Sequence, residues 1–159
     1  MAALTADTDH PHKGSLDDCK LAVKAVGADT FFKGAFVFGD ATNGKAQVTA
    51  PAAGDVFLGI CAKQVVAAAA DDLVDIYTGG LWALNMATPV EGDVGDVCII
   101  DITGTPTDNP ADAVTGTDAT TAVNDLLIGK ILAIDIEETT RAWILIQPGM
   151  IYSATLGWV

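Results

Sequence analysis

The sequence predicts an all-β fold, either a small β-barrel or a tight β-sandwich, built from two similar β units. Short segments rich in Val, Ile, Phe, Tyr and Trp recur along the chain, and these residue types favour strands. Clusters of Gly, Asn, Asp and Pro separate the segments, as turns between strands require. The second half of the chain also repeats the apolar pattern of the first, which indicates two related units.

The first predicted strand begins at Cys19, where apolar and polar residues alternate with a period of two as far as Lys24. A helix over 16–26 is the alternative, but the β-rich sequence that follows favours a strand. The further predicted strands are 35–38, 46–50, 55–65, 73–77, 81–84, 96–103, 125–135 and 142–147. The polar, Thr- and Asp-rich stretch 103–124 between the late strands predicts an exposed loop or a flexible hairpin.

An internal repeat supports the two-unit architecture. The matching segments are GAFVF (34–38) with GDVCII (95–100), DVFLGICAKQV (55–65) with DLLIGKILAID (125–135), and DLVDIY (72–77) with RAWILI (141–146). In the second pair, Gly59 and Gly129 each interrupt an apolar strand, which is typical of a bend or a bulge. Two such units packed with approximate two-fold symmetry would close a small barrel.

The apolar members of the repeated strands form the predicted core. They are Leu58, Ile60, Val74, Ile76, Val97, Ile99, Ile128, Ile131, Trp143 and Leu145. The three cysteines, Cys19, Cys61 and Cys98, stand among apolar neighbours at wide spacings. We therefore interpret them as small buried side chains rather than as a disulfide or a zinc site.

Two terminal segments differ from the domain between them, which is assigned to 16–149. Residues 1–15 are polar and lack periodicity, so they predict a flexible N-terminal arm. Residues 150–159 form a tail of unusually apolar composition, which favours burial on the protein itself or on a partner. The opening residues lack the apolar centre of a signal peptide, so we expect synthesis in the cytosol.

The charge excludes several classes of partner. The 159 residues carry 8 Lys and Arg against 21 Asp and Glu, a net charge of −13. Sequence-independent nucleic-acid binding needs cations that displace phosphate counterions, and an anionic membrane surface would repel this chain. No apolar stretch approaches the length of a membrane span. We expect no nucleic-acid partner and no membrane partner.

A catalytic site is not expected, because His10 and His12, both in the arm, are the chain's two histidines. A nucleophile activated by histidine needs an ordered imidazole beside it, and no GxSxG motif is present. Phosphate-binding glycine patterns are absent, and no acidic cluster follows the calcium-loop pattern. We predict neither an enzyme nor a cofactor nor a metal site.

Candidate interface residues lie in the two terminal segments. In the arm they are the cationic or titratable His10, His12 and Lys13. In the tail they are the apolar and aromatic Ile151, Tyr152, Leu156 and Trp158. Aromatic residues are favoured at protein interfaces, so the tail predicts contacts with a partner or with another subunit, and docking on the protein's own surface is the alternative.

From Cys19 to Gln147 the sequence resembles the small capsid cement, or head decoration, proteins of tailed bacteriophages. An opening strand leads to a GxxVxxG strand, here in CKLAVKAVGADTFFKGAFVFGD (19–40). The central pattern AxxGDxxLGIA, continuing to a late VxVxxxG, corresponds to AAGDVFLGICAKQVVAAAADDLVDIYTGGLWALN (52–85). The later motifs correspond to GDVGDVCIID (92–101), LIGKILAID (127–135) and the closing strand RAWILIQPG (141–149).

The resemblance implies a non-enzymatic structural protein of the virion that binds the outer surface of a phage capsid. It implies the major capsid protein as partner and a homotrimer as the assembly, made in the host cytoplasm. The alternative is a virion- or fibre-borne module that binds a cell-surface carbohydrate. In that case Trp82 and the loop 103–124 would be the contacts, so an exposed Trp82 favours the alternative and a buried one favours the capsid protein.

Overall fold

The computed structural model describes residues 5–48, 55–86, 89–101, 114–116, 125–147, 152–153 and 157–158. Within these ranges the elements are antiparallel strands and two three-residue 3-10 helices, η1 (Asp17–Cys19) and η2 (Glu91–Asp93). The all-β prediction is therefore confirmed. No helix among the described residues has the length and apolar character needed to cross a bilayer.

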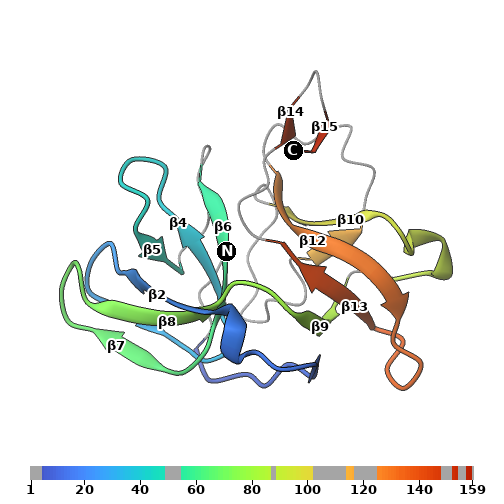
Figure 1. Cartoon of the computed structure of the whole chain (residues 1–159), viewed down its shortest axis with the longest axis horizontal. Coiled ribbons are helices and arrows are strands. Elements are labelled where there is room, and N and C mark those ends of the chain that lie inside the picture. The colour runs from blue at the N-terminus through green and yellow to red at the C-terminus, as the bar shows by residue number, and fades with distance from the viewer. Residues whose placement is uncertain are drawn as a thin grey trace.

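Two sheets form the body of the protein and lie side by side in Figure 1. The first has the order β2 (Lys20–Lys24), β8 (Leu73–Tyr77), β6 (Val56–Cys61), β4 (Phe36–Gly39) and β5 (Ala46–Gln47). The second has the order β1 (His12–Lys13), β9 (Leu81–Asn85), β13 (Arg141–Ile146), β12 (Asp125–Ile134), β10 (Val97–Asp101) and β11 (Val114–Gly116). Two-stranded pairs accompany them: β3 (Asp29–Phe31) with β7 (Val65–Ala67), and β14 (Tyr152–Ser153) with β15 (Gly157–Trp158).

The two sheets repeat one topology. The order β2-β8-β6-β4-β5 corresponds strand by strand to β9-β13-β12-β10-β11, and β1 is an addition at the edge of β9. Matching hydrogen bonds support the correspondence. The Gly34 N–H donates to the carbonyl of Cys61 at 2.9 Å, and the Gly95 N–H donates to that of Ile131 at 2.9 Å. The predicted two-unit construction is therefore present in the fold.

Each unit also carries a β-bulge at the same place. The pairing between β4 and β6 skips Leu58, and the pairing between β10 and β12 skips Ile128. Each skipped residue directly precedes the glycine that the sequence singled out, Gly59 or Gly129. A bulge bends a strand and increases its twist, so the prediction of a bend at these glycines is confirmed.

One pair of the sequence repeat is shifted by one residue in the structure. The carbonyl of Tyr77 faces Gly59 and the carbonyl of Leu145 faces Gly129, so Tyr77 corresponds to Leu145. The matching of DLVDIY with RAWILI had placed Tyr77 opposite Ile146. Because successive side chains of a strand point to opposite faces, a shift of one residue exchanges inward and outward positions.

This shift explains two of the errors in the predicted core, those at Trp143 and Leu145. Five of its members are buried: Ile60, Val74, Ile76, Ile128 and Ile131. Trp143 and Leu145 are only half-buried, because Ala142, Ile144 and Ile146 are the inward residues of β13. Leu58 is also half-buried, at the bulge. The side chains of Val97 and Ile99 lie outside the described part.

The core has two parts, and β4 contributes to both. Phe36 and Phe38 of β4 pack with Phe57 of β6 and with residues of the second sheet, and this cluster joins the two units. Val37, between the two phenylalanines, belongs to a second cluster inside the first unit. The continuous apolar run of β4 therefore reflects a strand that is buried on both faces.

Some boundaries differ from the predicted ones. The predicted strand 55–65 ends as β6 at Cys61, and β7 starts at Val65 after a turn. Of the predicted loop 103–124, the structure describes the short strand β11, and the rest lies outside the described residues. Barrel closure is not seen in the described part: the end strands of the first sheet meet through a single parallel bridge between Ala25 and Ala46.

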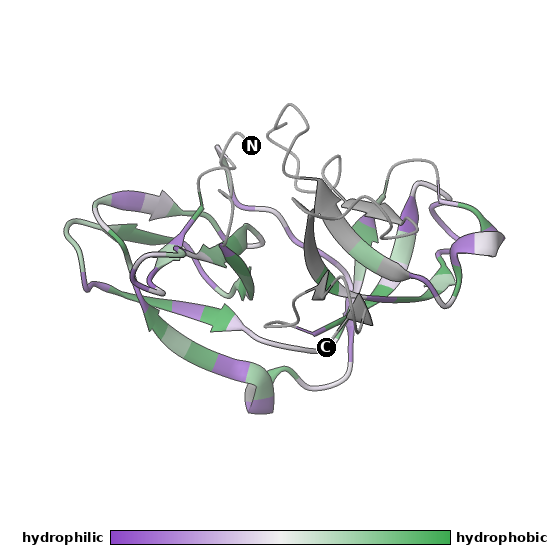
Figure 2. Cartoon of the chain, turned by 90° about the horizontal axis from the view of Figure 1, so that it is seen from above, coloured by the Kyte–Doolittle hydropathy of each residue, from purple (hydrophilic) through white to green (hydrophobic). Residues whose placement is uncertain are grey.

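Apolar and polar residues alternate along the strands of the first sheet, as the hydropathy colours of Figure 2 show. In β8 the buried Val74 and Ile76 alternate with exposed or half-buried neighbours. At β2 and β8 the outward face of this sheet is consequently exposed to solvent, and it carries Lys20, Lys24 and Asp75.

Candidate functional site

The N-terminal arm contains three of the predicted interface residues, and the structure places its described part against both sheets. His12 and Lys13 form β1, which pairs with Trp82 and Leu81 of β9. Directly before β1, the carbonyl of Pro11 accepts a hydrogen bond of 2.8 Å from the backbone N–H of Ala83. The arm thus extends the second sheet by one short strand.

The preceding part of the arm is bound to the first unit through Lys33. The Thr8 N–H donates to the carbonyl of Lys33 at 2.8 Å, and the Lys33 N–H donates to Asp7 Oδ1 at 2.9 Å. The Lys33 ammonium also forms an ion pair with Asp9. The hydrogen bond from that ammonium lowers the pKa of the Asp9 carboxyl and raises the pKa of Lys33.

Gly34 makes this close approach of the arm feasible. Its φ is +83°, and a Cβ at this position would overlap with the carbonyl oxygen of Thr8. Gly34 opens the segment GAFVFG (34–39) that is part of the resemblance, but the sequence alone did not reveal that the arm would lie against it. Asp7, Asp9 and Lys33 were missed for the same reason, because no sequence pattern links groups so far apart in the chain.

His10 is held between the arm and the first sheet. Its Nε2 lies 3.1 Å from the carbonyl oxygen of Gly34, and its ring stacks on Phe36 with a centroid distance of 6.5 Å. Burial lowers the pKa of His10, because desolvation disfavours the charged imidazolium. The geometry is that of a ring Nε2–H which donates to a backbone carbonyl.

The side chains of His12 and Lys13 lie against aromatic rings of the second sheet. The His12 ring lies 5.3 Å from the Trp82 ring, and the ammonium of Lys13 lies 4.4 Å from the centroid of the Trp143 ring. The latter is a cation–π contact, which contributes about 0.5–1 kcal/mol at an exposed site. Trp82 is 4% exposed, and its Nε1–H donates to the carbonyl of Gly79 at 2.9 Å.

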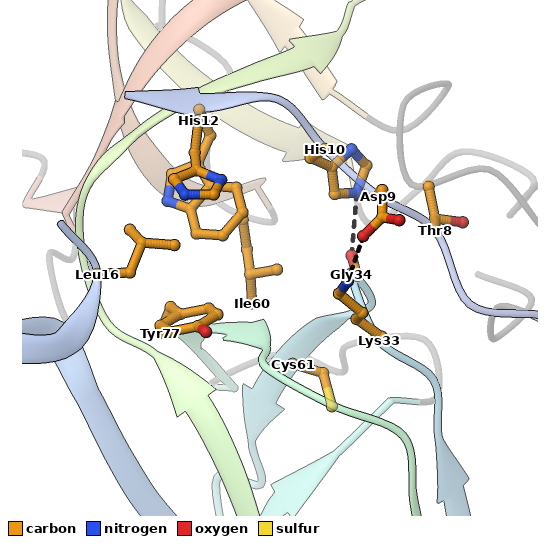
Figure 3. A pocket seen from close by; sticks show the side chains of 11 residues that line it. Thr8, Asp9, His10, His12, Leu16, Lys33, Gly34, Ile60, Cys61 and Tyr77 are labelled. Carbon is orange, nitrogen blue, oxygen red and sulfur yellow. Dashed lines mark hydrogen bonds and ion pairs between the residues drawn. The ribbon is translucent and has the colours of Figure 1, made fainter. Parts of the chain in front are cut away.

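A small cavity of about 140 Å³ remains beneath the arm. Figure 3 shows His12 above it and Tyr77, Ile60 and Leu16 around it, while His10 turns aside toward Gly34. Most of these walls are apolar or aromatic. Such a space can hold a few ordered waters or one small side chain.

The tail residues are placed only in part. Tyr152 pairs with Trp158 across β14 and β15, while Ile151 and Leu156 lie outside the described residues. The role of the tail residues as an interface therefore stays a prediction. The three cysteines are free thiols; Cys61 and Cys98 are buried, and Cys19 is half-buried.

Across the described ranges, no group of three or more His, Cys, Asp or Glu side chains could hold a metal ion. Comparison with known proteins gives no match to a family model, to a curated protein or to a solved structure. These contacts form a clasp: the short strand β1, the ion pair of Lys33 with Asp9 and the half-buried imidazole of His10 join the arm to both units.

Proposed function

We propose that this protein is a structural capsid decoration protein, which binds the outside of a tailed-phage head and stabilises the shell. The major capsid protein would be its partner, and a homotrimer its assembly. The observation that carries the proposal is the role of the glycines in the motifs that resemble the cement proteins. Gly34, Gly59 and Gly129 each lie where a Cβ would overlap with a backbone carbonyl oxygen. The resemblance therefore involves residues on which the fold depends, rather than common surface dipeptides.

The fold supports a mechanical role. Two similar sheets share one apolar cluster, to which the first contributes phenylalanines and the second Leu84, Ile128 and Ile144. A well-packed body of this kind transmits load without deforming. Many copies that each bury a modest interface would then reinforce a symmetric shell together. The strongly acidic composition opposes self-aggregation of unbound copies.

The alternative, a carbohydrate-binding module, needs an exposed aromatic ring on which a sugar can stack. Trp82 was the proposed ring, but it is 4% exposed and lies beneath His12. A sugar could reach it only if the arm left β9. This burial favours the capsid proposal over the carbohydrate alternative.

The experiment is a comparison of purified particles of the encoding virus with particles that lack this protein. We expect the protein on wild-type particles at a copy number set by the capsid symmetry. Particles without it should release their DNA at a lower temperature. Absence of the protein from purified particles, or specific retention on a glycan array, would overturn the proposal.

A further inference from the structure

The internal repeat places β2 of the first sheet in the position that β9 has in the second. The Thr78 N–H donates to the carbonyl of Cys19, and the Ile146 N–H donates to that of Gly80, at the start of the two strands. The N–H groups of Ala25 and Met86 make matching bonds at the other ends. Counting from these bonds, Leu21 corresponds to Trp82 and Ala22 corresponds to Ala83.

In the second sheet, the edge at this position is covered. The Ala83 N–H points away from β13 and donates to the carbonyl of Pro11, and β1 continues along the edge. Trp82 is almost fully buried under this segment. An extended segment on this edge is therefore an established part of the fold in one of its two units.

In the first sheet, the same edge is open. Among the described strands β2 is the last of its sheet, and Leu21, the counterpart of Trp82, is 54% exposed. The carbonyl of Cys19 and the N–H of Ala25 form hydrogen bonds with Thr78 and Asp72, the residues that flank β8. Because the backbone groups of successive residues in a strand point to opposite sides, those of Ala22 point away from β8. β5 contacts the chain only after the end of β2, where the Val26 N–H donates to the carbonyl of Ala46.

The open edge also carries lysine side chains that form ion pairs with carboxylates of the first unit. Lys20 and Lys63 share the carboxylate of Asp75, at 3.3 and 2.9 Å. Lys24 and Lys45 share that of Asp71, at 3.8 and 2.9 Å. Lys20 and Lys24 of β2 thus flank Ala22, while Lys63 reaches Asp75 from the end of β6 and Lys45 reaches Asp71 from the start of β5.

We propose that the free edge of β2 binds an extended, acidic strand of a partner protein. The partner strand would add to the first sheet as β1 adds to the second, with backbone hydrogen bonds to Ala22 and an apolar residue over Leu21. Acidic side chains of the partner would meet Lys20 and Lys24. The β2 edge of a second copy is a poorer occupant, because antiparallel pairing centred on Ala22 would set Lys20 opposite Lys24. The proposal concerns the surface itself and does not depend on the partner being a capsid.

The test uses a short, fluorescein-labelled peptide of alternating Asp and Val, with a matched peptide of Lys and Val. Fluorescence anisotropy should show binding of the acidic peptide at least about tenfold tighter than that of the basic one. Ala22→Pro removes the outward N–H, and an edge strand tolerates proline where no ladder bond is lost. This change should weaken binding at least about tenfold. The double variant Lys20→Glu, Lys24→Glu should do the same without altering the backbone.

Lys130→Glu is the matched control, because Lys130 is an exposed lysine on β12, in the other sheet. It should bind the acidic peptide as the wild type does. Equal binding by the wild type and by a folded Ala22→Pro protein would overturn the proposal, as would equal binding by the double variant. A third result would also overturn it: the outward amide of Ala22 protected from hydrogen exchange in the unliganded protein, with dimerisation lost in Ala22→Pro. That outcome would assign the edge to a second copy.

Discussion

Gly59 and Gly129 are structural equivalents, and each one faces a carbonyl oxygen of the neighbouring strand, that of Tyr77 or Leu145. Both directly follow the residue that the strand pairing skips. The bulge and the glycine are therefore one feature, used once in each unit. It lets β6 and β12 bend while the next strand approaches closely.

Replacement of either glycine by alanine should destabilise the fold. The added Cβ has to displace a backbone carbonyl, and at Gly59 the φ of +150° adds strain. We expect each change to lower the free energy of unfolding by about 1–3 kcal/mol, measured by urea denaturation. Gly27→Ala is the control, because nothing lies within 4 Å of its Cβ position. Wild-type stability in both Gly59→Ala and Gly129→Ala would mean that the bulges are not close-packed.

The bends at these glycines could be predicted from the sequence, because an isolated Gly inside an apolar strand is a local signal. It also predicted most strands, since period-two alternation and turn residues are local too. The register of β13 was harder to predict, because in RAWILI nearly every residue is apolar. The inward face then depends on which residue lies opposite Gly129, and that is a property of strand pairing.

Core packing in the second sheet can be tested at Ile144. This side chain is fully buried in the cluster that joins the two sheets. Ile144→Ala should lower the free energy of unfolding by about 2–5 kcal/mol, measured by denaturant or thermal unfolding. Ile136→Ala is a matched control, since Ile136 is 94% exposed and should change stability by less than about 0.5 kcal/mol. Similar effects of the two changes would contradict the register of β13.

The stability of the protein should fall as the pH drops below 7, partly through His10. Burial lowers the pKa of His10 in the folded protein below the value of 6.5 in the unfolded chain. The unfolded chain therefore takes up a proton first. The resulting loss of stability begins near the unfolded pKa and is complete once the pH is below the folded pKa.

His10→Gln should reduce this pH dependence, because an amide can still donate to the carbonyl of Gly34 but does not titrate. The measurement is the free energy of unfolding between pH 7 and pH 5, compared between variant and wild type. His12→Gln, in the exposed strand β1, serves as the control for a second histidine of the arm. A pH profile that is identical in wild type and His10→Gln would show that the His10 imidazole contributes nothing to the pH dependence.

Sequence patterns could not predict the docking of the arm. The segment from Asp7 to Lys13 has no periodicity, and its partners, Lys33 and Trp82, are remote in the chain. The expectation of a flexible arm followed from composition alone, and composition cannot indicate a strand of only two residues. The position of β1 depends on an edge that exists only once β9 and β13 have paired.

Deletion of residues 1–14 should expose Trp82. The deletion removes β1, the His12 ring and the hydrogen bond of Pro11, which cover the edge of β9. In a background of Trp143→Phe and Trp158→Phe, the emission of Trp82 should shift to longer wavelength and become more accessible to acrylamide. The same background with the arm intact is the control. Unchanged emission and quenching would contradict the docked arm.

The same arm provides the last test, which separates attachment to a shell from the clasp on the protein itself. Deletion of residues 1–4 leaves every described contact of the arm in place, whereas deletion of 1–14 removes them all. If residues 1–4 attach to the capsid, both deletions should weaken binding to undecorated shells, measured by co-sedimentation. If the arm only holds the two units of the protein together, the protein that lacks residues 1–4 should bind as the wild type does.

In that case the double variant Lys20→Glu, Lys24→Glu should weaken shell binding, because the edge of β2 is then the attachment surface. Wild-type binding by all three variants would exclude both arm and edge and leave the tail, with Tyr152 and Trp158, as the surface to examine.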